Sequence, residues 1–349
     1  MRNGSFGESD PGGGLRARWP RVAAFGMPLL LGLIVLLIAM AVRVWTATGE
    51  GRRPLSVAIN PWPGYEFAML AQELGYFEEE DVEVRMVELG SLGDARRAFE
   101  RGQVDGMFGT VIEVLMTRRM SDRDPVVTLV ADTSDGADVV LARRPASSMA
   151  DLRGRRIGVE SGSLTAVLLA RALEASGMSV TDVEVVWMPA IDMPGAFREG
   201  QIEGAVCYPP FSIGIQADGE ASVLFSSAEI PGDIVDVLAF DASVLASRKE
   251  DVRRFQRAFF RAQAFASADP ETAFSIMARR QGISPTDFRA ALEDGMRVLG
   301  ASDQAAYFGS DGRLRSIFAK TARELVALGE LPPSTSEPGA SAFVETGGE

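Results

Sequence analysis

The chain has 349 residues, of which 46% are hydrophobic and 24% are charged, and its formal net charge is −13. This composition is that of a globular protein, and the excess of negative charge repels nucleic acid, so we expect no nucleic-acid partner. There is no histidine and one cysteine, Cys207, which excludes an intrachain disulfide, a Cys/His zinc site and a histidine general base; we expect neither a metal nor a cofactor.

The first predicted element is apolar. Residues 22–42 contain no charge, and a run of about 21 such residues is long enough to cross the hydrocarbon core of a bilayer. Arginines in residues 1–21 precede it, which predicts a cytoplasmic N-terminus. Residues 22–45 are then either a membrane anchor or a signal peptide, for which Ala-Met-Ala at 39–41 offers small residues. Both alternatives place the remaining chain in the periplasm or another extracytoplasmic space.

From residue 55 onward, strands and helices alternate, and the pattern occurs twice. The stretch AFERGQVDGMF (98–108) returns almost unchanged as AFREGQIEGAV (196–206). Alternating apolar residues predict strands, and apolar residues at helical spacing before a glycine predict helices. Each copy reads strand, helix, strand, helix, strand. The predicted elements are strands at 55–60, 81–89, 156–160 and 182–189, helices at 67–75, 98–101, 164–177 and 196–199, and a third strand that ends each copy.

This repeat predicts two lobes. A β-α-β-α-β unit with helical crossovers forms a small parallel sheet, because right-handed crossovers return the chain in the same direction. Ligands of open parallel sheets bind beyond the carboxyl ends of the strands. Two such sheets facing each other at those ends would enclose a cleft.

The rest of the chain joins and completes these units. Residues 132–138 and 230–240 combine turn residues with short β-branched runs, and we expect them to contain the two connections between lobes. Beyond residue 241 the pattern is mainly helical. The predicted helices run over 248–268, from Asp269-Pro270, from Ser284-Pro285 and over 314–328. Residues 334–349, rich in Ser, Gly and Glu, predict a disordered tail.

The order of several motifs resembles the NitT/TauT family, the extracytoplasmic solute-binding proteins of ABC importers for nitrate, taurine, alkanesulfonates and thiamine-pyrimidine compounds. The resemblance covers about 55–331. The motifs are WPGYEFAMLAQELGYFEEE (62–80), SLGDARRAFERGQVDGMFG (91–109), DTSDGADVVLARR (132–144), SMADLRGRRIGVESGSLTAVLLARAL (148–173), AFREGQIEGAVCYPPF (196–211) and SSAEIPGDIVDVL (226–238).

The resemblance implies an α/β, two-lobed periplasmic-binding-protein fold of the two-crossover (type II) kind, preceded here by one N-terminal hydrophobic helix. The C-terminal helices would return to the first lobe, giving 54–138 with 237–331 as lobe 1 and 139–236 as lobe 2. It also implies capture of a small solute and delivery to the transmembrane subunits of an ABC permease. We expect a monomer.

Six loops at strand ends and helix starts would line the cleft, at 60–65, 90–91, 109–110, 160–165, 189–192 and 208–211. The candidate ligand-binding residues are Trp62, Tyr65, Ser91, Thr110, Ser161, Ser163, Thr165, Tyr208 and, from the second connection, Asp236.

Each candidate has a structural alternative. The loop at 161–165 offers free N–H groups and hydroxyls to an anion, or simply caps a helix through Ser163. Trp62, Tyr65 and Tyr208 could stack on a solute or pack within a lobe.

Aspartates 132, 135, 138, 233 and 236 could bind an ammonium group, although turn capping is the more ordinary role for most of them. Asp236 stands out because it lies in an apolar strand. The six loops contain no arginine, which argues against an anion held by an ion pair.

Two other functions are alternatives to an importer's binding protein. The resemblance extends to a fungal-type pyrimidine synthase on the same fold, which relies on histidine and a cysteine-rich metal motif. This chain lacks both, so we expect no enzymatic activity. A membrane-tethered sensor or adaptor would be favoured by an uncleaved anchor at 22–45.

Overall fold

The computed structural model describes residues 32, 34–40, 53–309 and 311–332. The chain divides into two compact units, residues 1–53 and 54–349. In the first unit the described residues, 32 and 34–40, are helical. No described helix combines the length and apolar character needed to span a bilayer. Most of the apolar segment predicted over 22–42 lies outside the described residues, as do residues 1–21 and the tail at 334–349.

In the second unit, the described strands form two sheets. The first has the order β11-β4-β10-β3-β1-β2, in which β1, β2 and β3 are mutually parallel and β10 runs antiparallel between β3 and β4. Its strands are β1 (Leu55–Ile59), β2 (Val84–Glu88), β3 (Gly106–Thr110), β4 (Pro125–Ser134), β10 (Val235–Asp241) and β11 (Met296–Val298).

The second sheet repeats this plan in the order β7-β6-β8-β5-β9. Here β6 pairs in parallel with β7 and β8, and β5 is antiparallel to both β8 and β9. Its strands are β5 (Val139–Arg143), β6 (Arg156–Val159), β7 (Glu184–Trp187), β8 (Gly204–Cys207) and β9 (Ala221–Ser226). In each sheet one antiparallel strand, β10 or β5, enters from the other sheet, so the chain crosses between the sheets twice.

Two glycines explain why the repeated stretches resemble each other. Gly106 and Gly204 open the third strand of each copy, opposite Val57 and Ile157. A Cβ on Gly106 would lie 2.6 Å from the Phe240 ring, and one on Gly204 would lie 2.8 Å from Ile157 Cδ1. The repeated glycine is therefore required by the close approach of neighbouring side chains.

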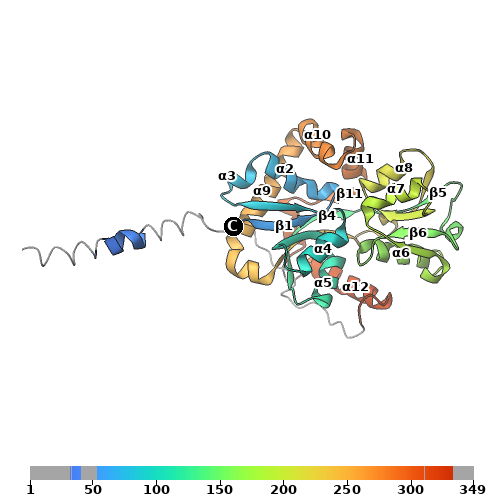
Figure 1. Ribbon diagram of the computed structural model, residues 1–349, viewed down its shortest axis with the longest axis horizontal. Coiled ribbons are helices and arrows are strands. Elements are labelled where there is room, and N and C mark those ends of the chain that lie inside the picture. The colour runs from blue at the N-terminus through green and yellow to red at the C-terminus, as the bar shows by residue number, and fades with distance from the viewer. Residues whose placement is uncertain (1–31, 33, 41–52, 310, 333–349) are drawn as a thin grey trace, which may run out of the picture. The chain divides into compact units, whose positions relative to one another are not determined.

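Helices cover both faces of each sheet (Figure 1). The α-helices of the second unit are α2 (Glu66–Glu73), α3 (Tyr76–Glu79), α4 (Leu92–Glu100), α5 (Val111–Met120), α6 (Leu164–Ala175), α7 (Met193–Arg198), α8 (Phe211–Gln216), α9 (Ala242–Ala268), α10 (Pro270–Gln281), α11 (Pro285–Asp294) and α12 (Arg313–Ala327). The short 3-10 helices are η1 (Pro63–Tyr65), η2 (Met149–Leu152), η3 (Val180–Asp182), η4 (Ala190–Asp192), η5 (Ser227–Glu229) and η6 (Ala301–Ala306).

Some elements differ from the sequence prediction. The helix predicted at 98–101 is only the end of α4, which begins at the N-cap Ser91, whose side chain accepts a hydrogen bond from Asp94 N. The helix predicted at 248–268 begins at residue 242 and is interrupted by non-helical backbone at Arg248. The sequence pattern does not predict α5, α8, β9 or β11. Their apolar runs are short, and short runs do not distinguish a strand from a helix by periodicity.

The core of the first sheet explains why the C-terminal helices belong with it. Phe255 of α9 is fully buried, with its ring centroid 4.9 Å from that of Phe77, 6.2 Å from Phe240 and 6.4 Å from Phe108. These partners come from α3, β10 and β3. Helix α9 therefore shares one core with α3 and β3, which precede both crossovers, and with β10, the strand that follows the second crossover.

Candidate functional site

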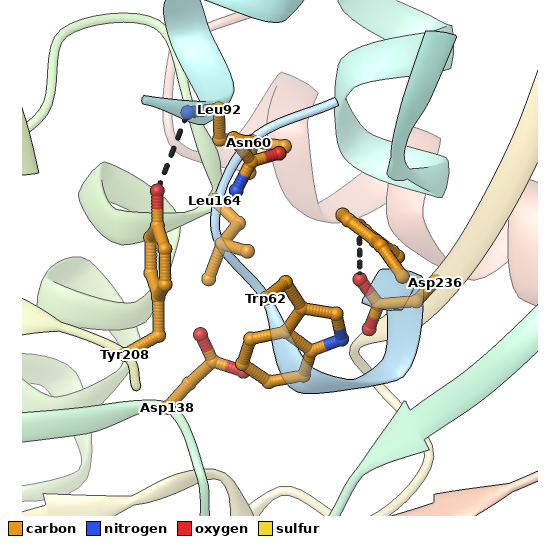
Figure 2. Close-up of a pocket in the computed structure, with 8 residues that line it drawn as sticks. Asn60, Trp62, Leu92, Asp138, Leu164, Tyr208 and Asp236 are labelled. Carbon is orange, nitrogen blue, oxygen red and sulfur yellow. Dashed lines mark hydrogen bonds between the residues drawn. The ribbon is translucent and has the colours of Figure 1, made fainter. Parts of the chain in front are cut away.

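A small cavity lies where strand ends of the two sheets meet (Figure 2). Four of its lining residues are predicted site residues, namely Trp62, Tyr65, Tyr208 and Asp236. The others are Asn60, Leu92, Asp138 and Leu164. The empty space is about 190 Å³. In this conformation the two sheets are closed around the cavity.

Three aromatic side chains form its walls. Trp62 precedes η1 and Tyr65 ends it, while Tyr208 follows β8 on the other sheet. The Trp62 and Tyr208 ring centroids are 5.9 Å apart at an interplanar angle of 77°, and those of Trp62 and Tyr65 are 6.3 Å apart. All three are buried. An edge-to-face contact between the two sheets thus closes one side of the cavity.

Two carboxylates stand opposite each other beside this wall. Asp132 of β4 and Asp236 of β10 are cross-strand partners. Trp62 Nε1 donates to both Asp132 oxygens at 3.2 Å, and the Tyr65 hydroxyl donates to Asp236 Oδ1 at 2.5 Å. Burial, followed by the charge of Asp132, raises the pKa of Asp236 well above its ordinary value. Burial also raises the pKa of Asp132, to about 7. Since two adjacent buried carboxylates resist double ionisation, Asp236 keeps its proton and Asp132 is the member of the pair that ionises first as pH rises.

Asp138 is a third buried carboxylate, in the first connection just before β5, and its side chain extends toward Trp62 and Tyr208 (Figure 2). Among the described residues, neither oxygen accepts a hydrogen bond of ordinary geometry. Burial raises the pKa of Asp138 to about 7, although the nearby Ser134 hydroxyl lowers it. The sequence favours a turn-capping role for this residue. The structure differs, because no turn N–H reaches its carboxylate.

The other predicted residues are hydroxyls outside the cavity lining. Ser91, Thr110 and Ser163 are the N-caps of α4, α5 and α6. Thr165 Oγ1 accepts from Glu160 N at 3.0 Å, and Ser161 is exposed. Their part in ligand binding stays a prediction. Asp138 could have been found by the argument used for Asp236, since it directly precedes an apolar strand. The sequence offered no comparable signal for Asn60, Leu92 or Leu164.

Direct hydrogen bonds join the two sheets around the cavity. Glu113 of α5 accepts from Leu164 N, the first residue of α6, at 2.8 Å. In the opposite direction, Glu160 accepts from Gly93 N, in the first turn of α4, at 2.6 Å. Leu92 N donates to the Tyr208 hydroxyl at 3.3 Å. Each lobe's carboxylate thus sits at a helix N-terminus of the other, where the helix dipole favours negative charge.

A wider depression, with an empty space of about 1590 Å³, lies between α9, α10 and α11. Its walls include Phe260, Phe274 and Ala301, all from the first lobe. Among the described residues, none of the buried side-chain atoms that lack a hydrogen-bond partner belongs to its lining. We therefore place the candidate site in the smaller cavity. Its lining includes buried oxygens without a hydrogen-bond partner, and closure of the two sheets would control access to it.

The close packing of Gly64 against Asp132 gives a first prediction. A Cβ on Gly64 would overlap Asp132 Oδ2 and lie 3.0 Å from Trp62 Nε1. We expect Gly64→Ala to lower the free energy of unfolding by about 1–3 kcal/mol, as overpacking does, and to change the near-ultraviolet circular dichroism of the displaced indole. Gly195→Ala is the control, because a Cβ there meets nothing within 4 Å. Equal stability of the two variants would show that the Asp132–Trp62 contact is loose.

Known proteins resemble this chain along much of its length. A Brucella abortus protein named only as a binding protein is 29% identical over 208 residues, which cover 58% of this chain and 64% of that protein. The chain thus matches less than two thirds of that relative's length. The taurine-binding periplasmic protein of Escherichia coli is 26% identical over 59% of this chain and 66% of that protein.

Solved structures share the fold. The alkanesulfonate-binding protein SsuA from Xanthomonas axonopodis pv. citri, solved with MOPS bound, superposes with a TM-score of 0.67 over 84% of this chain and 100% of that one, at 17% identity. The desulfurization enzyme DSZB superposes with a TM-score of 0.61 over 84% and 97%, at 18% identity. The predicted two-lobed periplasmic-binding-protein fold is confirmed. The sequence profile of the NMT1-like family matches residues 48–279, so the chain belongs to the NMT1-like family, in agreement with the resemblance inferred from its motifs.

Proposed function

We propose that the protein is the extracytoplasmic solute-binding component of an ABC importer, which captures a small solute between its lobes and delivers it to a membrane permease. The observation that carries this proposal is the buried cavity to which both sheets contribute aromatic and polar side chains. The relatives named for taurine and alkanesulfonate binding support it. Trp62, Tyr65, Tyr208 and Asp236 would contact the solute, together with Asp138, while the hydroxyls at 91, 110, 163 and 165 would fix the helix starts around it.

Solute capture would operate by a shift between open and closed lobes. Residues 54–138 with 237–331 form one lobe in this proposal, and 139–236 form the other. The hydrogen bonds from Leu164 N to Glu113 and from Gly93 N to Glu160 would break on opening and re-form on closure. The closed monomer would then dock on the permease. Residues 22–45 would direct the protein out of the cytoplasm, as a signal or as an anchor.

A binding function is favoured over catalysis, although one fold neighbour, DSZB, is an enzyme. The sequence contains no histidine, and its one cysteine is Cys207. Burial raises the pKa of this thiol far above its ordinary value, and a cysteine acts as a nucleophile only as the thiolate. The residues that line the cavity therefore serve recognition rather than nucleophilic attack.

Removing the indole of Trp62 is expected to weaken solute binding by about 30-fold, as loss of a buried aromatic anchor does. Full-length protein would be screened by thermal unfolding against small amines, sulfonates, pyrimidines and oxyanions. At a hundred times Kd a bound solute adds about 2.7 kcal/mol of stability, which moves the unfolding midpoint by a few degrees. The affinity of each stabilising solute would then be measured for Trp62→Ala.

The matched control for this experiment is Ala301→Trp, which adds bulk to the wider depression without touching the cavity. We expect it to bind as the parent does. Loss of binding in Ala301→Trp with normal binding in Trp62→Ala would move the solute site to the depression. Turnover of a panel compound would instead favour an enzyme.

A further inference from the structure

The unpaired polar atoms of the cavity lining are all oxygens. In the part of the chain that the structure describes, Asp138 Oδ1 and Oδ2 and Asn60 Oδ1 accept no hydrogen bond, and the other unpaired oxygen, Asp236 Oδ2, belongs to a carboxyl that keeps its proton. These three residues are 1–3% exposed. A buried oxygen that accepts no hydrogen bond destabilises the folded state, and it does so more strongly when it is charged. The lining therefore needs donors from something other than the protein.

The aromatic donors that line the cavity already have partners, and Asn60 Nδ2 donates to Pro61 O at 3.3 Å. Trp62 Nε1 donates to Asp132. The Tyr65 hydroxyl donates to Asp236 at 2.5 Å, and the Tyr208 hydroxyl faces Glu160 Oε2 at 3.5 Å while it accepts from Leu92 N. An anionic group in the cavity would have to compete for these donors, and it would approach Asp138 and Asp132 without a compensating cation. An oxyanion would therefore be repelled.

The two helix N-termini that could hold an anion are also filled. Glu113 accepts from Leu164 N of α6 at 2.8 Å, and Glu160 accepts from Gly93 N of α4 at 2.6 Å. Both carboxylates are buried. A sulfonate at either helix would have to displace a covalently tethered carboxylate, which has a high effective concentration there. Closure thus uses the protein's own acidic side chains at the positions where the helix dipoles would attract an anionic solute.

We propose that the solute is a small, planar, cationic molecule with several N–H donors, such as an amidinium or a protonated aminoheterocycle, and not a sulfonate or another oxyanion. The inference rests on the proposed binding function and specifies its substrate class. The N–H groups would donate to Asp138 and Asn60, and the charged plane would contact Trp62 and Tyr208, whose ring faces attract cations. Asp138 is the specificity-determining residue in this proposal.

The acidity of the cavity adds a pH signature. Burial raises the pKa of Asp138 to about 7, so the carboxylate is mostly ionised at pH 8 and mostly protonated at pH 5. The titratable groups that share this electrostatic environment are all acids, namely Asp132, Asp236, Glu113, Cys207 and Tyr208. A bound cation lowers the pKa of Asp138, so binding near pH 6 should release a proton and affinity should fall as pH decreases.

The test uses three compounds of matched shape, benzamidine as the cation, benzamide as the neutral N–H donor and benzenesulfonate as the anion. Binding to the full-length protein would be measured by calorimetry at pH 8 and pH 6. We expect benzamidine to bind more tightly than benzamide and benzenesulfonate not to bind. Asp138→Asn should weaken benzamidine binding by at least about tenfold, because a charge-assisted pair becomes neutral, and should abolish the proton release at pH 6.

The control is Glu66→Gln. Burial raises the pKa of Glu66 to about 7 as well, but this carboxylate pairs with Arg280 and does not line the cavity, so benzamidine affinity should not change. Binding of benzenesulfonate, or undiminished benzamidine binding by Asp138→Asn, would overturn the proposed solute class while leaving solute capture intact. If none of the three binds and the broad panel described above also fails, the proposed function fails with it.

Discussion

Replacing Asp138 by asparagine is expected to stabilise the solute-free protein at pH 8 and to have little effect near pH 4. Burial raises the pKa of the folded-state carboxyl to about 7 from its ordinary 3.8. Between these values the folded protein holds a proton that the unfolded chain has lost, so the free energy of unfolding falls as pH rises through this window. Three pKa units correspond to about 4 kcal/mol as an upper bound. Asparagine cannot ionise, so the free energy of unfolding of the variant should not fall in this way as pH rises.

Urea unfolding of parent and variant at several pH values between 4 and 8 would measure the difference. Asp182→Asn is the contrasting control. Backbone N–H donation from Ser179 lowers the pKa of Asp182, so its carboxylate stabilises the folded state above pH 4, and its replacement should slightly destabilise the protein at pH 8. If Asp138→Asn instead destabilised the protein equally at every pH, Asp138 would be a structural hydrogen-bond acceptor and the cavity would not need a cation.

This result would also have a functional meaning. A variant that is more stable without solute and yet binds a cation less well shows that the binding site is built at a cost in stability. The uncompensated carboxylates disfavour closure of the lobes in the absence of solute, because closure desolvates them. A cationic solute would supply the missing charge, and closure would then be coupled to the arrival of the correct ligand.

Phe255→Ala is expected to lower the free energy of unfolding by about 3–5 kcal/mol, the usual loss for a large aromatic side chain in a core. Phe255 is fully buried and its ring lies beside those of Phe77, Phe108 and Phe240. Its removal leaves a cavity between α9 and the first sheet. Denaturant unfolding followed by far-ultraviolet circular dichroism would measure the effect, since this helix is long and its loss changes the signal strongly.

Phe260→Ala serves as the matched control, because Phe260 lies on the same helix but is only partly buried beside the wider depression. We expect a loss of about 1 kcal/mol there. At temperatures where it remains folded, Phe255→Ala should still bind solute, since Phe255 does not line the cavity. A loss below about 1 kcal/mol for Phe255→Ala would show that α9 is not packed against β3 and β10.

Most of the architecture followed from local pattern. The alternation of Val82, Val84 and Met86, and the glycine that closes each helix, predict elements that need only a few neighbouring residues to be recognised. The stretch GQVDG returns as GQIEG, and each stretch leads into the third strand of one β-α-β-α-β unit. The repeat therefore predicts two sheets. Helix starts with Asp269-Pro270 and Ser284-Pro285 were also predicted, and their side chains cap α10 and α11. Edge elements such as β11 were missed, because three residues carry no periodicity.

The site was only partly predictable. Trp62, Tyr65, Tyr208 and Asp236 were identified from strand-end position and residue type, and they do line the cavity. The hydroxyls at 91, 110 and 163 occur in equally plausible loops, but their oxygens are used by helix N-caps. The sequence favours an ordinary turn role for Asp138, because a sequence does not show whether an N–H group will be near enough to donate to a carboxylate.

By itself, the sequence determined the fold class, the two-lobe plan and the acidic, histidine-free character of the chain, since these depend on composition and on periodicities of a few residues. Only the tertiary structure decided which charges meet. Glu113 and Leu164, or Glu160 and Gly93, are far apart in the chain and come together only when the two sheets close. Among the residues that the structure describes, the same closure leaves the Asp138 carboxylate buried without a hydrogen bond. Burial and pairing depend on three-dimensional proximity, and they are what turn an ordinary aspartate into a candidate ligand for a cation.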